Sequence, residues 1–355
     1  MGMKGFKGFE KDFSCKGKQY EENTTYEEHG VGCCHKGVMH FCEDPWEVLN
    51  HYDLVDGNGN FSEFAEVEAL GQVWNDGEKR ATNKIHIGAK LGFKDFIKAC
   101  IDFTIERTKF DGSSGDSAKI GSSGNYAQIG SSGDSAKIGS SGDSALIGSS
   151  GNYAKIGSSG GSAQIGSSGN YAKIGSSGDY AQIGSSGDSA LIGSSGDFAQ
   201  IGSSGNSAKI GSSGNSAQIG TSGNSAQIGS SGDSAQIGSS GDSAQIGSSG
   251  NSAQIGSSGN SAKIGSSGDY AQIGSSGNSA KINSTGEDAV IMCAGSRSKA
   301  KGKKGSWITL AEWVKDEEKG RYVPVCVKTE RVDGEKIKED TYYTLKNGEF
   351  VEVEE

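Results

Sequence analysis

The dominant pattern of the chain is a nine-residue alternation of one large apolar residue with small and polar residues, between Gly112 and Gly295. Each unit reads I-G-S-S-G-[D/N]-[S/Y/F]-A-[K/Q/L], and isoleucine recurs at every ninth position from Ile120 to Ile291. A fixed short period is typical of a solenoid, in which each unit buries its apolar face only against its neighbours. A flexible Gly/Ser-rich linker has no reason to keep isoleucine in register over this distance. The pattern therefore predicts a repeat rod.

The alternation within each unit predicts which side chains point inward. Ala, Ile and the first Ser lie at i, i+2 and i+4 of a strand, so they share one side of it, and the residue before Ile faces the other side. Because Ile is the large apolar residue of the unit, we expect Ala, Ile and Ser to line the core. The remaining S-G-[D/N] is typical of a turn, with Gly free to adopt a positive φ and Asp or Asn able to bond local backbone.

The polar position before each isoleucine sets the size of the coil. Lys119, Lys137, Lys155 and Lys173 are 18 residues apart, and every later lysine of the repeat keeps this frame, whereas the interleaved positions hold Gln apart from Leu146. Two units therefore form one coil. We expect a mainly β chain built on a two-sided parallel β-solenoid of about ten 18-residue coils, with one basic and one uncharged face and strands about 4.8 Å apart.

The segment before the repeat, residues 1–110, predicts an α+β domain. Strand patterns cover 37–42, 63–70 and 84–91, and Asp44-Pro45 is typical of the start of a helix. A second, amphipathic helix is expected over 93–108. Since an open solenoid end exposes unpaired strand edges, we expect this helix to cover the first coil.

The repeat loses its regularity toward its end, as terminal repeats that cap a solenoid do. We place the solenoid at residues 111–295. A basic linker at 296–305 is expected to follow it, and a small β-meander at 306–355, with hairpin turns at Asp333-Gly334 and Asn347-Gly348.

Composition narrows the class of protein. The formal net charge of −10 argues against nonspecific nucleic-acid binding by the whole chain. The seven cysteines are odd in number and irregularly spaced, which does not indicate a disulfide framework. The first residues lack the apolar core of a signal peptide, and no run approaches the roughly 18 apolar residues of a membrane span. These features are typical of a cytoplasmic protein with reduced thiols and no membrane association.

Candidate chemistry is sparse. Cys15, Cys33, His40 and Cys42 are weak candidates for a zinc site, because His40 and Cys42 lie at i, i+2 and a nearby cysteine adds a third ligand. Their spacing matches no paired C-x-x-C site, and buried thiols with a hydrogen-bonded histidine account for the same residues. Residues 1–110 hold no phosphate-cradling Gly loop, nucleophile motif or paired-carboxylate signature. We expect no catalytic residue and no cofactor.

Two alternatives for the repeat are calcium binding and ice binding. Calcium β-rolls also use an 18-residue coil, but they place Asp two residues before the apolar position, whereas Asp or Asn here lies four residues before it. Ice-binding solenoids usually present ranks of outward threonine, and the ranks here are Ser with Gln or Lys.

Two surfaces are candidates for interaction. Lys119, Lys137, Lys155 and Lys173 form a basic stripe, which is either a solvated row that keeps rods apart or a docking stripe for an acidic partner. The opposite face lacks lysine, and we expect it to associate with its own copy in a homo-dimer or other homo-oligomer. An outward aromatic row that only stiffens the sheet, or a dimer contact through the C-terminal meander, remains an alternative. The residues proposed for that face are Tyr126, Tyr180, Gln182, Phe198, Gln200 and Tyr270.

The segments MKGFKGFEKDFSCKGKQYEENTTYEE, GVMHFCEDPWEVLNHY, FAEVEALG and NKIHIGAKLGFKDFIKACIDF resemble an N-terminal domain of phage and prophage repeat proteins. The resemblance covers residues 1–110 closely and the repeat in style. It brings no established activity and no catalytic residues, but it implies a mobile-element origin and work inside an infected bacterium.

From these observations we expect a non-enzymatic scaffold, a rigid rod that oligomerises and engages a host or virion protein. Inhibition of a host defence is one role that this context suggests. The alternative is an enzyme, in which residues 1–110 act on a small molecule or nucleotide and the rod is a spacer.

Overall fold

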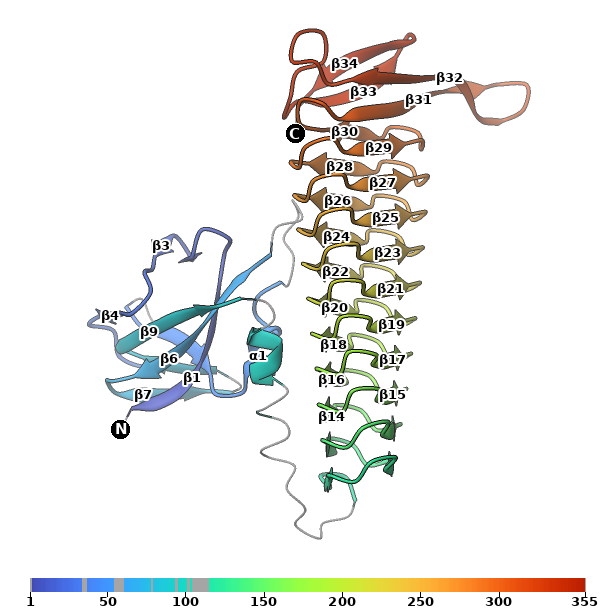
Figure 1. Cartoon of the computed structure of the whole chain (residues 1–355). Helices are drawn as coiled ribbons and strands as arrows, with labels where there is room; N and C mark the ends of the chain where they lie inside the picture. Colours follow the sequence, from blue (N-terminus) through green and yellow to red (C-terminus); the bar gives the residue numbers. More distant parts are fainter. Residues whose placement is uncertain are drawn as a thin grey trace.

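The computed structural model describes residues 2–33, 37–53, 61–77, 79–92, 95–100, 103 and 115–354. It consists of an N-terminal antiparallel sheet, a long solenoid and a hairpin cap, with the N-terminal sheet beside the middle of the rod (Figure 1). No helix in this part of the chain is long and apolar enough to cross a membrane.

The solenoid has two parallel sheets, named here the lysine sheet and the glutamine sheet. The lysine sheet contains β10 (Lys119–Ser122), β12 (Lys137–Ser140), β14 (Lys155–Ser158), β16 (Lys173–Ser176), β18 (Leu191–Ser194), β20 (Lys209–Ser212), β22 (Gln227–Ser230), β24 (Gln245–Ser248), β26 (Lys263–Ser266), β28 (Lys281–Ser284) and β30 (Lys299–Lys301). The glutamine sheet contains β11 (Gln128–Ser131), β13 (Leu146–Ser149), β15 (Gln164–Ser167), β17 (Gln182–Ser185), β19 (Gln200–Ser203), β21 (Gln218–Thr221), β23 (Gln236–Ser239), β25 (Gln254–Ser257), β27 (Gln272–Ser275), β29 (Val290–Cys293) and β31 (Trp307–Asp316).

Each coil is 18 residues, as the lysine spacing predicts. Lys137 pairs with Lys155 and Ile138 with Ile156, and this register repeats along both sheets. Ala, Ile and the first Ser of each unit are buried from about the second coil onward, which confirms the predicted inward side. The rod has about 11 coils, because the ladder of strands runs from residue 119 to residue 310.

The core of the rod is thin and partly polar. The hydroxyl oxygens of Ser140 and Ser149, and those of most equivalent serines, are buried and make no hydrogen bond to another described residue. A buried hydroxyl without a partner costs free energy. The strands and turns, by contrast, are joined to the next coil by regular backbone hydrogen bonds of 2.7–3.0 Å, such as Lys155 N to Ala136 O at 2.8 Å. Backbone stacking therefore contributes much of the rod's stability.

The turns differ from the expectation in two respects. The residue with positive φ is the one before Ala, as at Ser144 (φ 57°), and the turn glycines are needed for close stacking instead. A Cβ added to Gly142 would lie 2.1 Å from the carbonyl oxygen of Gly124 in the preceding coil. The Asp and Asn side chains bond the next coil, since Asn125 Oδ1 accepts from Asp143 N at 2.9 Å. Both residue types supply this Oδ1 acceptor, which explains why they interchange.

The N-terminal domain is a seven-stranded antiparallel sheet in the order β4-β9-β6-β1-β5-β8-β7, with a small β2–β3 hairpin beside it. The strands expected at 63–70 and 84–91 are β6 and β9, and the short helix α1 (Pro45–Val48) follows Asp44, whose side chain accepts from Trp46 N at 3.0 Å. The strand bounds are β1 (Met3–Phe9), β2 (Ser14–Cys15), β3 (Lys18–Gln19), β4 (Thr24–Glu27), β5 (Met39–Cys42), β6 (Glu63–Ala69), β7 (Val73–Asp76), β8 (Lys79–Thr82) and β9 (Lys84–Leu91).

The segment expected as a linker at 296–305 belongs to the solenoid. β30 pairs in parallel with β28, and Ala300 takes the inward position of isoleucine. β31 pairs in parallel with β29, with Ile308 and Leu310 inward. The Gly/Ser repeat ends here, but the alternation of small or apolar inward residues continues. Antiparallel strands β32 (Arg321–Arg331), β33 (Tyr342–Lys346) and β34 (Glu349–Val353) then close the rod.

The expected position of the second helix is corrected by the structure. Residues 95–100 are helical, but Ile97 packs against Gly193 in β18, in the middle of the rod and not on the first coil. Most of the remaining residues of the expected helix, 93–108, lie outside the described residues. An amphipathic stripe predicts that a helix is covered, but not which part of a uniform rod covers it.

Candidate functional site

The outward side of the lysine sheet, called here the lysine face, is covered by the chain's own N-terminal domain. Lys155 Nζ contacts the carboxylate of Asp44 and lies 4.0 Å from Glu47 Oε1. Lys209 Nζ lies 3.1 Å from Asp53 Oδ1 and 3.2 Å from the carbonyl oxygen of Leu49. The acidic partner of these lysines is therefore intramolecular.

An apolar contact lies between these two ion pairs. Leu191 takes the position that lysine holds in neighbouring coils, and it is buried in one cluster with Phe96, Ile97 and Cys100. A Cβ added to Gly193 would lie 2.7 Å from Ile97 Cδ1, so only glycine admits the helix this closely. Burial, followed by the charge of Asp44, raises the pKa of the Cys100 thiol well above its usual value, as expected of a dry contact.

The contact extends one coil further at Asp53. Gln227 Nε2 donates to Asp53 Oδ1 at 3.1 Å beside the Lys209 contact. Burial acts to raise the pKa of Asp53, but the hydrogen bonds from Gln227 and Lys209 outweigh it, so the pKa lies below its usual value. The carboxylate is thus held in its charged form against the rod.

The predicted basic stripe is divided by this contact. Lys155 contacts the N-terminal domain directly, and Lys173 is buried. All four lysines of the predicted stripe line one crevice, which also contacts Glu47 of α1; they are Lys119, Lys137, Lys155 and Lys173. The sequence did not single out Asp53, Leu191 or Lys209. Leu191 is the residue from which this contact could have been predicted, because an apolar side chain there interrupts a row of lysines.

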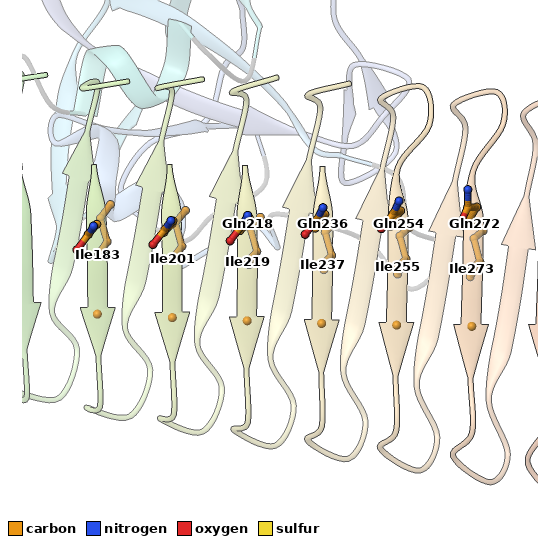
Figure 2. Close-up of a pocket in the computed structure, with 18 of the residues that line it drawn as sticks. Ile183, Ile201, Gln218, Ile219, Gln236, Ile237, Gln254, Ile255, Gln272 and Ile273 are labelled. Atoms are coloured by element: carbon orange, nitrogen blue, oxygen red, sulfur yellow. The ribbon is translucent and has the colours of Figure 1, made fainter. Parts of the chain in front are cut away.

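The outward side of the glutamine sheet, called here the glutamine face, is open. Gln side chains form one exposed column and Gly residues a second, two positions further along each strand (Figure 2). A Cβ added to Gly166, Gly184 or Gly202 would meet nothing within 4 Å, in contrast to Gly193 on the lysine face. The two columns line a shallow groove of about 1300 Å³ that extends from Leu146 to Met292.

The glutamine face ends in an exposed apolar patch at its C-terminal end, made of Val290, Met292, Trp307 and Val327. Val290 pairs with Trp307, and Val327 lies opposite Ala311 on β31. All four side chains are about half exposed or more, from 47% for Trp307 to 64% for Val327. Isolated exposed apolar residues are ordinary, but neighbours on one sheet face such as Val290, Met292 and Trp307 are typical of an interaction surface.

The aromatic residues expected beside the glutamine column are exposed, and the rings of Tyr180 and Phe198 stack at 5.3 Å and 7°. Tyr126 and Tyr270 have φ near 60°, which places them in the turns that precede the strands. A second stacked pair, Tyr153 and Tyr171 at 5.0 Å, lies on the lysine side. Aromatic stacking thus occurs along both edges and does not distinguish the two faces.

The weak zinc candidates do not come together as a ligand set. Cys15 packs in one hydrophobic cluster of the N-terminal domain and Cys42 in another. His40 Nε2 lies 2.6 Å from the carbonyl oxygen of Cys33, which leaves the imidazole engaged with backbone. Among the described residues, no group of three or more His, Cys, Asp or Glu side chains has a geometry that holds a metal ion.

The sequence analysis missed a buried lysine in the N-terminal domain. Lys7 Nζ lies 3.5 Å from Cys15 Sγ, 3.1 Å from the carbonyl oxygen of His40 and 3.3 Å from the hydroxyl of Tyr52. The rings of Phe9, Tyr20 and Tyr52 surround it. Burial lowers the pKa of Lys7, while Cys15 acts to raise it. All three donors of its ammonium group have a partner, which fits an internal packing role.

Comparisons with known proteins reach only the N-terminal domain. Residues 3–99 match a family model described as "Domain of unknown function (DUF7666)". This match covers the antiparallel sheet and the start of the helix that packs on Leu191. No curated protein and no solved structure matches the chain.

Proposed function

We propose that this chain is a non-enzymatic binding scaffold, whose rod presents the glutamine face to a protein partner. The proposal is supported by one observation: the lysine face and the glutamine face have the same design, but only one of them is covered. Both carry a Gly column beside a column of long side chains, but the N-terminal domain covers the middle of one, and the other is open from Leu146 to Met292.

The covered face shows what such a surface does when it is occupied. Ile97 packs onto backbone at Gly193, and polar groups on either side bond the adjacent long side chains. The glutamine face offers the same backbone access at Gly184 and Gly202 and adds an apolar patch at its C-terminal end. Protein interfaces typically combine an apolar part with polar surroundings, and this face has both.

The other roles weighed for this sequence have less support. In the repeat, Asp and Asn share one structural task, so the carboxylate charge that a calcium site needs is not required there. The one threonine in the strands of the repeat, Thr221, is buried rather than outward. The satisfied Lys7 cluster supports a packing role rather than catalysis. The phage resemblance adds a context, in which the protein acts inside the infected cell, where a host protein, a virion protein or a second copy of the chain is available as partner.

The test is site-specific photo-crosslinking in bacteria that express the full chain. A benzophenone amino acid in place of Gln218, on the open face, is expected to form discrete protein adducts. The same group in place of Lys263, an exposed position on the other sheet, is the matched control. Adducts from position 218 should disappear when Gln182→Lys and Gln200→Lys are added. Equal labelling from both positions, or none from position 218, would contradict the proposal.

A further inference from the structure

We propose that the partner on the glutamine face is a second copy of this chain, related by a twofold axis parallel to the rod. This inference rests on the proposed function, because it takes the glutamine face as the binding surface. In this arrangement the two rods point the same way, and the Gln column of each copy fills the Gly column of the other.

The repeat distance of the Gln column favours a second copy as the partner. Successive Gln side chains are one strand spacing apart, about 4.8 Å, over the seven coils from β15 to β27. An ordinary protein surface does not keep this period, so it meets the column in register at only one or two points. A second copy has the same period and stays in register along the whole groove.

The lack of charge on the glutamine face also favours a second copy. In a twofold interface both copies use the same surface patch. A charged column in that patch would therefore lie against, or close to, the same charge on the other copy. The Gln and Gly columns hold no ionisable side chain from Leu146 to Met292. The neutral face is therefore suited to self-association, and it offers no charge complementarity to an acidic or basic partner.

The direction of the twofold axis follows from how the Gln and Gly columns of the two copies meet. A twofold axis along the strands places Gln on Gln and Gly on Gly, which leaves empty space between the two Gly columns. An axis along the rod exchanges the columns, so Gln200 of one copy lies against Gly202 of the other. The space over Gly202 is open, with nothing within 4 Å of an added Cβ. Since protein interfaces pack densely, the axis along the rod is favoured.

The apolar patch favours the same direction. With parallel rods, Val290 of one copy meets Met292 of the other, and the contact is made twice. With antiparallel rods in the register that sets Leu146 against Val290, Met292 lies against Gly148 and Trp307 against Gln128, so only Val290 meets an apolar side chain.

The area is sufficient for a specific dimer. Nine strands about 4.8 Å apart, each with four residues at about 3.3 Å, give a face of roughly 43 by 13 Å. Two such faces bury about 1,100 Å², before Trp307 and Val327 of the apolar patch are added, which exceeds the roughly 1,000 Å² expected of a biological interface.

Cysteine crosslinking of the full chain tests the arrangement. The variants Gln164→Cys/Gly166→Cys and Gln272→Cys/Gly274→Cys place thiols at two heights of the rod, at outward positions. A Cβ at Gly166 or Gly274 meets nothing within 4 Å, so folding should be unaffected. We expect both variants to form covalent dimers under mild oxidation, with peptide mapping showing bonds between positions 164 and 166 and between 272 and 274.

The control variant Gln164→Cys/Gln272→Cys joins two copies only when the rods are antiparallel. A covalent dimer of this control, or the absence of dimers from both same-height variants, overturns the inference. If light scattering shows a monomer while position 218 still crosslinks to a different protein, the second-copy inference fails and the proposed binding function stands. If position 218 forms no adduct at all, both fail.

Discussion

Ile97 of the N-terminal domain lies directly over Gly193 of the rod, closer than any side chain with a Cβ at position 193 would permit. The strand glycine of each repeat, which follows the isoleucine, therefore has two uses. On the lysine face it admits a neighbouring domain to the backbone, and on the glutamine face the same position stays open.

A bulky residue at position 193 should release the N-terminal domain. Gly193→Val forces Ile97 away, at a cost of about 1–3 kcal/mol for overpacking. Hydrogen exchange should then accelerate in residues 95–100 and in β18. The matched control is Gly202→Val, at the same repeat position where a Cβ meets nothing within 4 Å. Similar exchange in the two variants would contradict the docking.

The ion pair of Lys155 with Asp44 should contribute to the same contact. Both side chains are largely buried, so Lys155→Gln leaves a charge unpaired and should weaken docking by about 1–3 kcal/mol. The thermal midpoint of the N-terminal domain is expected to fall. Lys263→Gln, an exposed position on the same sheet, is the control and should leave the midpoint unchanged. An equal fall in both variants would place the effect in the rod itself.

The turn glycines and the strand glycines should respond differently to alanine. A Cβ at Gly214 would lie 1.8 Å from the carbonyl oxygen of Gly196, so Gly214→Ala must separate two coils. We expect a loss of about 2–4 kcal/mol, visible as a lower urea midpoint. Gly130→Ala, at a strand glycine outside the groove, has open space and should be neutral, or gain about 0.5 kcal/mol from reduced chain entropy. Equal effects would contradict the stacked turns.

The buried Lys7 should make stability depend on pH. Because its folded pKa lies below that of the unfolded chain, the unfolded state binds more protons between the two values, so the free energy of unfolding from this group rises with pH in that window. Buried Tyr20 and Tyr52, whose pKa values are raised by burial, act in the opposite sense above about pH 10. Urea titrations at several pH values up to about 9.5 should show a smaller pH slope for Lys7→Met than for the parent. An identical slope would contradict a lowered pKa.

The sequence predicts the rod well because its information is local. The alternation around Ile138 determines what lies inside, and the 18-residue spacing of lysines determines the coil. The docking of the N-terminal domain is not local: Leu191 resembles ordinary variation within a repeat, and Asp44 is explained equally by its role as a helix cap. The role of the turn glycines was also hidden, because their carbonyl contacts involve residues 18 positions away. Only the stacked coils reveal it.

The central claim is that the chain's own N-terminal domain covers one face of the rod, and a second copy covers the other. The most direct measurement is the mass in solution by light scattering, for the parent and for Gln182→Lys/Gln200→Lys. We expect twice the chain mass of 36.5 kDa for the parent and 36.5 kDa for the variant. In the variant, each lysine is placed in the interface without any change to the core. A monomeric parent, or a variant that remains a dimer, would contradict the claim.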